Sequence, residues 1–370
     1  MSNNYVLYAW QCSHFSAKIR GYLNYKKIDY REKTISLYDI AVLIPRKTGA
    51  AAMPALKADD GTWLADTPLM IEELEKRHPQ RPIYATTPRQ RILELLVENW
   101  FDDGWPAVSL QTRWAYSENW ETLLHDESAK ALLPGFPKLL SRRVATKVFH
   151  GSMNRLMNSA GARPDGQGEQ IESWALRILD LLEHHFDQYP YLFGGHPTSA
   201  DFAILGSLAA HQNRDPWPKR EWMAHRPRLV SWTERLHAGE GNYGPLLSDD
   251  GIAETLQPLI DLLLAEFPSL ISQTVEAIKS RVDRDGLTGG DELPRVEREV
   301  SYPMNGRAFK RRPFTYTIWR MQRIKDAYEQ LSRQEQYSVD QLLATNHCAD
   351  FLKSDLGPRL NRNGLGTRLA

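Results

Sequence analysis

The chain has few cysteines, no excess of charge of either sign and no long apolar run. Cys12 and Cys348 are its only cysteines in 370 residues, which argues against a disulfide framework and fits a reducing compartment. Its 46 basic and 46 acidic residues balance, so bulk charge favours neither nucleic acid nor an anionic membrane. No run reaches the roughly 18 apolar residues of a membrane helix, and the start MSNNYVLYAW lacks a signal-peptide pattern. We therefore expect a cytoplasmic protein of two or three domains, without nucleic-acid or membrane partners.

The most informative segment is residues 50–79. Two short strands, 55–58 and 62–65, flank Asp60-Gly61, a dipeptide that supplies the positive φ angles of a tight hairpin. Pro54 opens the first strand, where a cis bond after Met53 is inexpensive and leaves backbone groups exposed. Such an edge can pair with a peptide ligand.

Asp66-Thr67-Pro68 predicts a helix start directly after this hairpin. We expect Thr67 at the N-cap and Pro68 at the first helical position, with the helix continuing to Pro79. A helix N-terminus with a hydroxyl is a carboxylate site. The alternative is that Asp66 and Thr67 only cap their own helix.

The first 35 residues predict a β-α-β unit. Residues 5–10 are rich in β-formers, residues 15–23 carry apolar side chains on one helical face, and residues 28–35 alternate like a second strand. Together with the hairpin and the helix after Thr67, the order is β-α-β, hairpin, helix.

These residues resemble the cytosolic glutathione transferases, in particular their serine-type members. Leu7-Tyr8 followed by Ser13-His14-Phe15-Ser16-Ala17-Lys18-Ile19-Arg20 is similar to the family's S-P-F-S-x-K-V-R, Met53-Pro54 to its V-P, and Asp66-Thr67 to its E-S or D-S. Thr198 to Asp201 resembles the capping box of the family's helical domain. The resemblance implies an α/β plus all-α fold: a thioredoxin-like domain over residues 1–80, a helical substrate domain over 81–245 and, beyond the resemblance, an α+β extension over 246–370.

The resemblance also implies a site for glutathione as cosubstrate. An enzyme of this family joins glutathione to a small hydrophobic or aromatic electrophile, or uses it to displace a leaving group, and acts as a homodimer in detoxification. Ser13 occupies the position of the catalytic serine, with Cys12 and Tyr8 as rivals. The residues expected to bind glutathione are Met53, Pro54, Asp66, Thr67, His14 and Phe15, and no metal is expected.

Two features leave alternatives open. Cys12 next to Ser13 would suit a thiol-disulfide oxidoreductase, and a non-catalytic binding module would keep the same fold.

The family places a lysine shortly before its V-P motif, where this chain has Ala50-Ala51-Ala52, so Arg46 or Lys47 would have to supply that charge. His14 replaces the family's proline and is expected in an exposed loop or as an acid or base.

The remainder of the chain predicts mostly helices. Two helices are expected near 87–100 and 106–120, rich in aromatic residues that either pack internally or line an electrophile pocket. Further helices are expected over 169–186, over 256–278 with a break or kink near Pro268, and over 317–331, with a hairpin around Asn305-Gly306 and a mobile tail from Pro358. The basic cluster of Arg307, Lys310, Arg311 and Arg312 is either a solvated strand edge or a contact for an acidic ligand.

Overall fold

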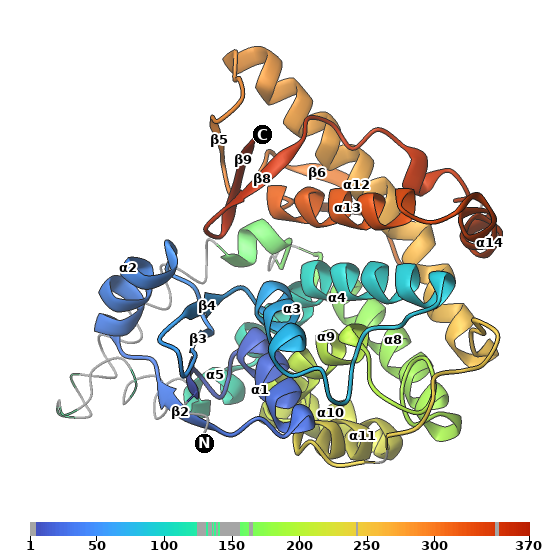
Figure 1. Cartoon of the computed structure of the whole chain (residues 1–370). Helices are drawn as coiled ribbons and strands as arrows, with labels where there is room; N and C mark the ends of the chain where they lie inside the picture. Colours follow the sequence, from blue (N-terminus) through green and yellow to red (C-terminus); the bar gives the residue numbers. More distant parts are fainter. Residues whose placement is uncertain are drawn as a thin grey trace. The chain divides into compact units, whose positions relative to one another are not determined.

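The computed structural model describes residues 5–123, 156–162, 166–241, 243–344 and 348–370, with single residues at 131, 135, 137 and 140 (Figure 1). The chain forms two compact units. The first contains Met1–Pro82, Val108–Met157 and Phe202–Asn242, and the second contains Ile83–Ala107, Asn158–Asp201 and Tyr243–Ala370. The domain boundaries expected at 80 and 245 stay a prediction.

The first unit holds a four-stranded sheet of order β2-β1-β3-β4. β1 (Tyr5–Ala9) pairs in parallel with β2 (Tyr30–Thr34) and antiparallel with β3 (Ala55–Lys57), which pairs with β4 (Trp63–Ala65). The predicted hairpin is confirmed, and Gly61 has the positive φ (86°) that its turn requires.

Helices lie on both faces of this sheet. α1 (His14–Lys26) and α3 (Thr67–Arg77) follow β1 and β4, whereas the π-helical η1 (Asp39–Leu43) and α2 (Ile44–Thr48) connect β2 to β3. Leu7 and Ala9 are buried on one face, and Tyr8 packs with Ile35 and Ile44 on the other. The β-α-β-α-β-β-α order of a thioredoxin-like domain is therefore confirmed.

A set of helices follows. Their bounds are α4 (Pro88–Ala115), α5 (Ser117–Leu123), α8 (Gly168–Gln188), α9 (Ser199–Ser207), η3 (Leu208–Gln212), α10 (Pro216–Glu221), η4 (Met223–His225) and α11 (Pro227–His237). The expected break before Pro106 was wrong, because α4 continues through it. A proline inside a helix costs about 3 kcal/mol, and the buried side chains of Phe101, Trp105 and Val108 on this helix can offset that cost.

The helix start at Thr198 contains half of the expected capping box. The Thr198 N–H and hydroxyl both donate to Asp201 Oδ2, at 2.8 and 2.9 Å, and the Leu192 N–H donates to Asp201 Oδ1 at 3.0 Å. The backward reach of Asp201 to Thr198 is thus confirmed. Through its hydrogen bond from Leu192, the Asp201 carboxylate also holds the segment that leads into α9.

The C-terminal residues form helices and two small sheets. After η5 (Glu254–Leu256) come α12 (Gln257–Asp285), β5 (Glu292–Leu293), β6 (Val300–Met304), β7 (Arg307–Arg311), α13 (Thr315–Glu329), α14 (Arg333–Ala344), η6 (Phe351–Lys353), β8 (Leu360–Asn363) and β9 (Gly366–Leu369). β6 and β7 form the expected hairpin, with positive φ at Asn305 and Gly306.

Two expectations for these residues need correction. Of the break or kink expected near Pro268 the break does not occur, since Phe267, Leu270 and Ile271 around it are buried and hold α12 as one helix. The tail is not free, because β8 and β9 form a hairpin in a three-stranded sheet of order β5-β9-β8. The inward alternation of Leu360, Thr367 and Leu369, joined by a turn at Gly364, explains this hairpin.

Arg311 does not belong to a surface cluster. It is 1% exposed and forms an ion pair with Asp103 of α4, whose other oxygen accepts from the Thr317 hydroxyl at 2.5 Å. Arg320 of α13 pairs with Asp102 and Glu98, at 2.6 and 3.0 Å. Residues 300–320 therefore supply two cations to three acidic side chains of α4.

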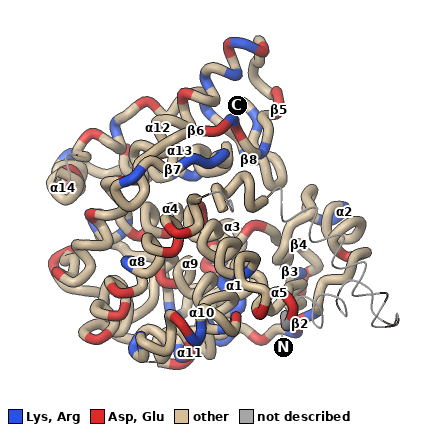
Figure 2. Tube along the Cα trace, turned by 180° about the vertical axis from the view of Figure 1, so that it is seen from behind, with Lys and Arg blue, Asp and Glu red and all other residues tan. Residues whose placement is uncertain are grey.

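Charge of both signs is interspersed along the described chain (Figure 2). No helix in the described ranges is long and apolar enough to cross a membrane.

Candidate functional site

The register of the first sheet brings three predicted segments to one end of it. Ala55, the first residue of β3, pairs with Tyr8 of β1 and with Ala65 of β4. The residues directly after β1, directly before β3 and directly after β4 must therefore lie at the same sheet end. These residues are Trp10 to Phe15, Met53-Pro54 and Asp66-Thr67.

Ser13 is the N-cap of α1. Its backbone is extended (φ −98°, ψ 126°), and its hydroxyl accepts from the Ser16 N–H at 3.4 Å. Because that bond uses the oxygen as acceptor, the hydroxyl hydrogen can still donate to a ligand. The 13-residue helix behind it adds a positive dipole end. A half-buried donor thus stands at a site that favours an anion.

The neighbours of Ser13 take different positions. Cys12 is half-buried, and its backbone carbonyl accepts a hydrogen bond from Arg113 at 2.7 Å. His14 was expected in an exposed loop, but it is the first residue of α1 and is buried. Its ring lies 4.7 Å from the half-buried Phe15 ring, centroid to centroid. The helix starts one residue earlier than expected, which brings His14 into the core.

Tyr8 lies in a packed cluster. Its ring is 4.9 Å from that of Trp63, and the Lys33 ammonium lies 5.0 Å from its centroid. Ile35 and Ile44 belong to the same buried cluster. This placement favours packing for Tyr8, and a catalytic role for it stays a prediction.

Met53 and Pro54 are joined by the expected cis peptide bond. In the described part of the chain, no hydrogen bond occupies the backbone N–H or C=O of Met53. An extended peptide could therefore pair there, as an added strand would.

The start of α3 differs by one residue from the prediction. Asp66, not Thr67, is the N-cap, with a positive φ of 78°, and Thr67 and Pro68 are the first two helical residues. The Asp66 side chain makes no capping hydrogen bond, and a carboxylate-binding role for Asp66 and Thr67 stays a prediction. Among the described residues the N–H groups of Thr67 and Leu69 have no partner, which leaves a helix N-terminus open to a carboxylate.

Arg46 and Lys47 are both exposed in the last turn of α2. They precede the three alanines in the chain. A role for either residue in binding an anionic ligand stays a prediction.

The aromatic residues between positions 100 and 120 divide into two groups. Trp100, Phe101 and Trp105 are buried, and Trp100 and Trp105 lie against Trp174 at centroid distances of 5.6 and 5.7 Å. The packing interpretation is confirmed for these three. Tyr116 stacks on Trp217 at 3.5 Å, and Trp114 and Trp120 are half-buried.

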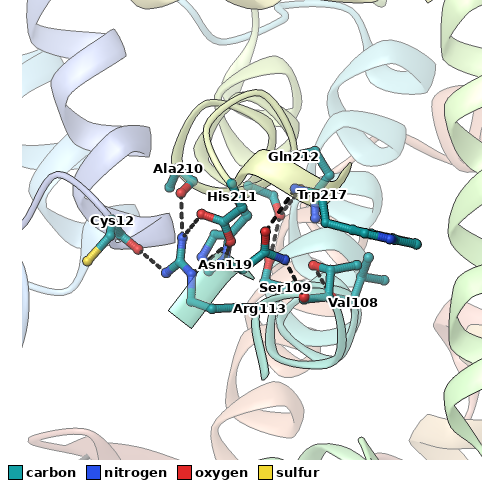
Figure 3. A network of polar contacts seen from close by, with 12 residues as sticks. Cys12, Val108, Ser109, Arg113, Asn119, Ala210, His211, Gln212 and Trp217 are labelled. Atoms are coloured by element: carbon teal, nitrogen blue, oxygen red, sulfur yellow. Dashed lines mark hydrogen bonds and ion pairs between the residues drawn. The ribbon is translucent and has the colours of Figure 1, made fainter. Parts of the chain in front are cut away.

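Two residues near Cys12 were not predicted. Arg113 of α4 and Asp215, the N-cap of α10, form a buried bidentate ion pair with both N–O distances at 2.8 Å (Figure 3). The only sequence signal would have been a basic residue on an otherwise buried helical face. Its partner lies 102 residues away, so the pair is invisible to local patterns.

A four-stranded sheet with this strand order, a cis-proline directly before β3 and a capped helix after β1 define a thioredoxin-like domain. Family models agree with that class. The model described as "Glutathione S-transferase, N-terminal domain" matches residues 7–82, and "Glutathione S-transferase, C-terminal domain" matches residues 169–235. Over these two segments the chain matches the glutathione S-transferase superfamily. Residues 236–370 lie beyond both matches.

One curated relative is "Failed axon connections" of Drosophila melanogaster, which is 25% identical over 189 residues. The aligned region is 48% of this chain and 44% of that protein. The chain therefore spans less than half the length of this relative.

The solved structures that the chain resembles are more distant in sequence. The β-etherase LigF of Sphingobium sp. strain SYK-6 is 17% identical, covering 64% of this chain and 96% of its own, at a TM-score of 0.40. A glutathione S-transferase of Methylobacterium radiotolerans, in complex with glutathione sulfonate, is 18% identical, covering 66% and 98%, at a TM-score of 0.39. A GST-like protein of Pseudomonas syringae is 16% identical, covering 85% and 97%, at a TM-score of 0.41.

Proposed function

We propose that this protein is a glutathione transferase that uses Ser13 to activate the thiol of glutathione. The thiolate then attacks a hydrophobic or aromatic electrophile, adding to it or displacing a leaving group such as an aryl ether or halide. We further propose that the enzyme works as a cytoplasmic homodimer in detoxification.

The N-cap geometry of Ser13 carries this proposal. A free thiol has a pKa near 8.5, so most of it is protonated at neutral pH, and each unit of lowering needs about 1.4 kcal/mol. The hydroxyl accepts from the Ser16 N–H and can donate its own hydrogen to sulfur. The N-terminus of α1 adds a favourable field at the same atom.

The other ends of the peptide have matching groups at the same sheet end. The unoccupied backbone of Met53, next to the cis-proline, suits the cysteinyl amide and carbonyl of glutathione. The open N-terminus of α3, at Asp66 and Thr67, suits the γ-glutamyl carboxylate. Arg46 or Lys47 would face the glycine carboxylate, and Phe15 with His14 would border the thiol.

Substitution of Ser13 tests the proposal. Ser13→Ala should lower kcat/KM for glutathione and an activated aryl halide at least about tenfold, which corresponds to roughly 1.4 kcal/mol of transition-state stabilisation. Ser13→Thr is the matched control, since it keeps both a hydroxyl and a good N-cap. Tyr8→Phe should retain activity, because its ring packs in a cluster.

Cys12→Ser separates this proposal from a thiol oxidoreductase. The proposed transferase keeps its activity in that variant, whereas an enzyme that forms a mixed disulfide at Cys12 loses it. A non-catalytic module predicts a third result, in which glutathione supports no turnover. If glutathione also fails to raise the melting temperature, the site does not bind it and the proposal is wrong.

A further inference from the structure

Arg113 connects the helical part of the first unit to the loop that carries Ser13. Its Nε and Nη2 donate to the two carboxylate oxygens of Asp215, Nη2 also donates to the Ala210 carbonyl at 2.7 Å, and Nη1 donates to the Cys12 carbonyl at 2.7 Å (Figure 3). Arg113 is 6% exposed and Asp215 is fully buried. Four hydrogen bonds thus fix the guanidinium in one orientation.

Asp215, which accepts from Arg113, and the residues around it are themselves held in place by further hydrogen bonds. Asp215 begins α10, where its N–H donates to the His211 carbonyl at 2.7 Å and its carbonyl accepts from the Lys219 N–H at 3.1 Å. The Trp217 N–H donates to Asn119 Oδ1 at 2.9 Å, and the Asn119 amide donates to the Thr112 carbonyl. Arg113 therefore cannot follow a movement of the Cys12 loop.

Of the four bonds, only the one to Cys12 leaves this helical network. It fixes the direction of the peptide group between Cys12 and Ser13. Figure 3 shows the sulfur of Cys12 pointing away from its carbonyl and from Arg113. The same peptide group precedes the N-cap hydroxyl, so its direction decides which of the two side chains faces the end of the sheet.

We infer that Arg113 is a positioning residue for Ser13: it holds the Cys12–Ser13 peptide so that the Ser13 hydroxyl, and not the Cys12 thiol, meets the sulfur of glutathione. This inference rests on the proposed function. It concerns the geometry of the loop around Cys12 and Ser13, which can be measured without catalytic turnover.

A test of the positioning role needs variants that still fold, so that a loss of activity can be assigned to the Cys12–Ser13 peptide. Arg113→Met alone leaves the Asp215 carboxylate buried without its partner, which is strongly destabilising. Arg113→Met with Asp215→Leu replaces the whole ion pair by apolar side chains and is the informative variant, because such replacements are often neutral. Arg113→Lys keeps the charge without the bidentate geometry. Arg220→Met is the control, since Arg220 pairs with Glu118 on the surface of the same unit.

The pH profile is the decisive readout. In the double variant we expect the pKa of enzyme-bound glutathione, followed by the ultraviolet absorption of its thiolate, to rise, and kcat at neutral pH to fall at least about tenfold, with recovery toward high pH. KM for glutathione should change less than threefold, because Met53 and α3 are untouched. Arg113→Lys should fall between the double variant and the wild type. An unchanged pH profile in a folded double variant would overturn the inference.

Alkylation of Cys12 gives a readout without catalysis. With iodoacetamide and peptide mass spectrometry, Cys12 of the double variant should react at least about fivefold faster than in the wild type, while Cys348 and the Arg220→Met control stay unchanged. If wild-type protein does not turn over glutathione but Cys12 alkylation responds as expected, the proposed function fails and the positioning role stands. An equal alkylation rate contradicts the positioning role.

Discussion

At the scale of single residues, burial has a larger effect on the carboxyl group of Glu266 than the groups that face it. Glu266 of α12 is 3% exposed, and its two oxygens accept from the Trp174 indole N–H at 2.9 Å and from the Asn305 N–H at 2.7 Å. Both donors favour the carboxylate, but burial dominates and raises the pKa of Glu266 to about 7. The group therefore titrates near neutral pH although its hydrogen bonds are satisfied.

The stability of the protein should depend on pH through Glu266. The folded chain holds a proton here that the unfolded chain, with a pKa of 4.5, releases, so the free energy of unfolding contributed by Glu266 falls as pH rises from about 4.5 to about 7. In Glu266→Gln that fall should disappear, and the variant should gain stability relative to wild type between pH 5 and pH 8 in urea unfolding.

The exposed glutamate Glu276 on the same helix provides the control. Its side chain is 64% exposed beside Lys279, so Glu276→Gln should leave the difference between pH 5 and pH 8 unchanged. An equal slope for wild type and Glu266→Gln would show that the buried carboxyl does not titrate in this window.

At the scale of elements, short-range sequence signals predicted the turns and the helix start that depend mainly on neighbouring residues. The Asp60-Gly61 and Asn305-Gly306 turns, the start of α1 to within one residue and the cis-proline at Met53 all follow from short-range preferences. Pro106 was misread as a break, and no break occurs at Pro268 either, because burial against residues distant in the sequence keeps each of the helices α4 and α12 continuous. The Arg113–Asp215 pair could not be predicted for the same reason, because the two residues lie 102 positions apart in the sequence.

The approach of α9 to α1 depends on a glycine. A Cβ on Gly206 would lie 2.8 Å from the His14 carbonyl oxygen and 2.9 Å from Lys18 Cβ. Gly206→Ala should therefore push α1 away from its neighbour, destabilise the protein by about 1–3 kcal/mol and lower the proposed activity by displacing Ser13. Thermal unfolding together with kcat/KM checks this prediction.

Gly104→Ala is the matched comparison in another helix. A Cβ there would meet Trp174 at an ordinary 3.5 Å, beside a small internal cavity. This variant should stabilise the protein by about 0.5–1 kcal/mol, because alanine lowers the entropy of the unfolded chain. Destabilisation by both variants to the same extent would show that the close contact at Gly206 is not the cause.

At the scale of the whole molecule, the residues after 285 are needed for the second unit to fold, because they carry the ion-pair partners of acidic side chains on α4. Arg311 and Arg320 pair with Asp103, Asp102 and Glu98, which are nearly fully buried on α4. A shortened chain would keep these acids without their cations. The C-terminal residues therefore act as a structural part of the second unit and not as an appended module.

Arg311→Met should be strongly destabilising, by about 3–5 kcal/mol, because it leaves the Asp103 carboxylate buried and unpaired. Removal of residues 287–370 should abolish soluble folded protein, since the loss approaches a typical total stability of about 5–15 kcal/mol. Urea unfolding of the point variant and circular dichroism of the shortened chain measure these effects.

Arg359→Met is the control, because Arg359 pairs with Asp326 on the surface and its side chain is 54% exposed. That variant should lose no more than about 1 kcal/mol. A shortened chain with wild-type thermal stability would contradict the structural role of the C-terminal residues.

The buried charge on β7 also restricts how the β6–β7 hairpin can form. Phe309 and Arg311 face inward, whereas Arg307 and Lys310 are exposed. A slip of one residue would turn every side chain of the strand to the opposite face, placing Lys310 inside and Arg311 in solvent. Asp103 would then lack the planar, two-pronged cation that it contacts. Apolar residues alone would tolerate several alignments, so the ion pair distinguishes the native alignment of this hairpin from its nearest competitors.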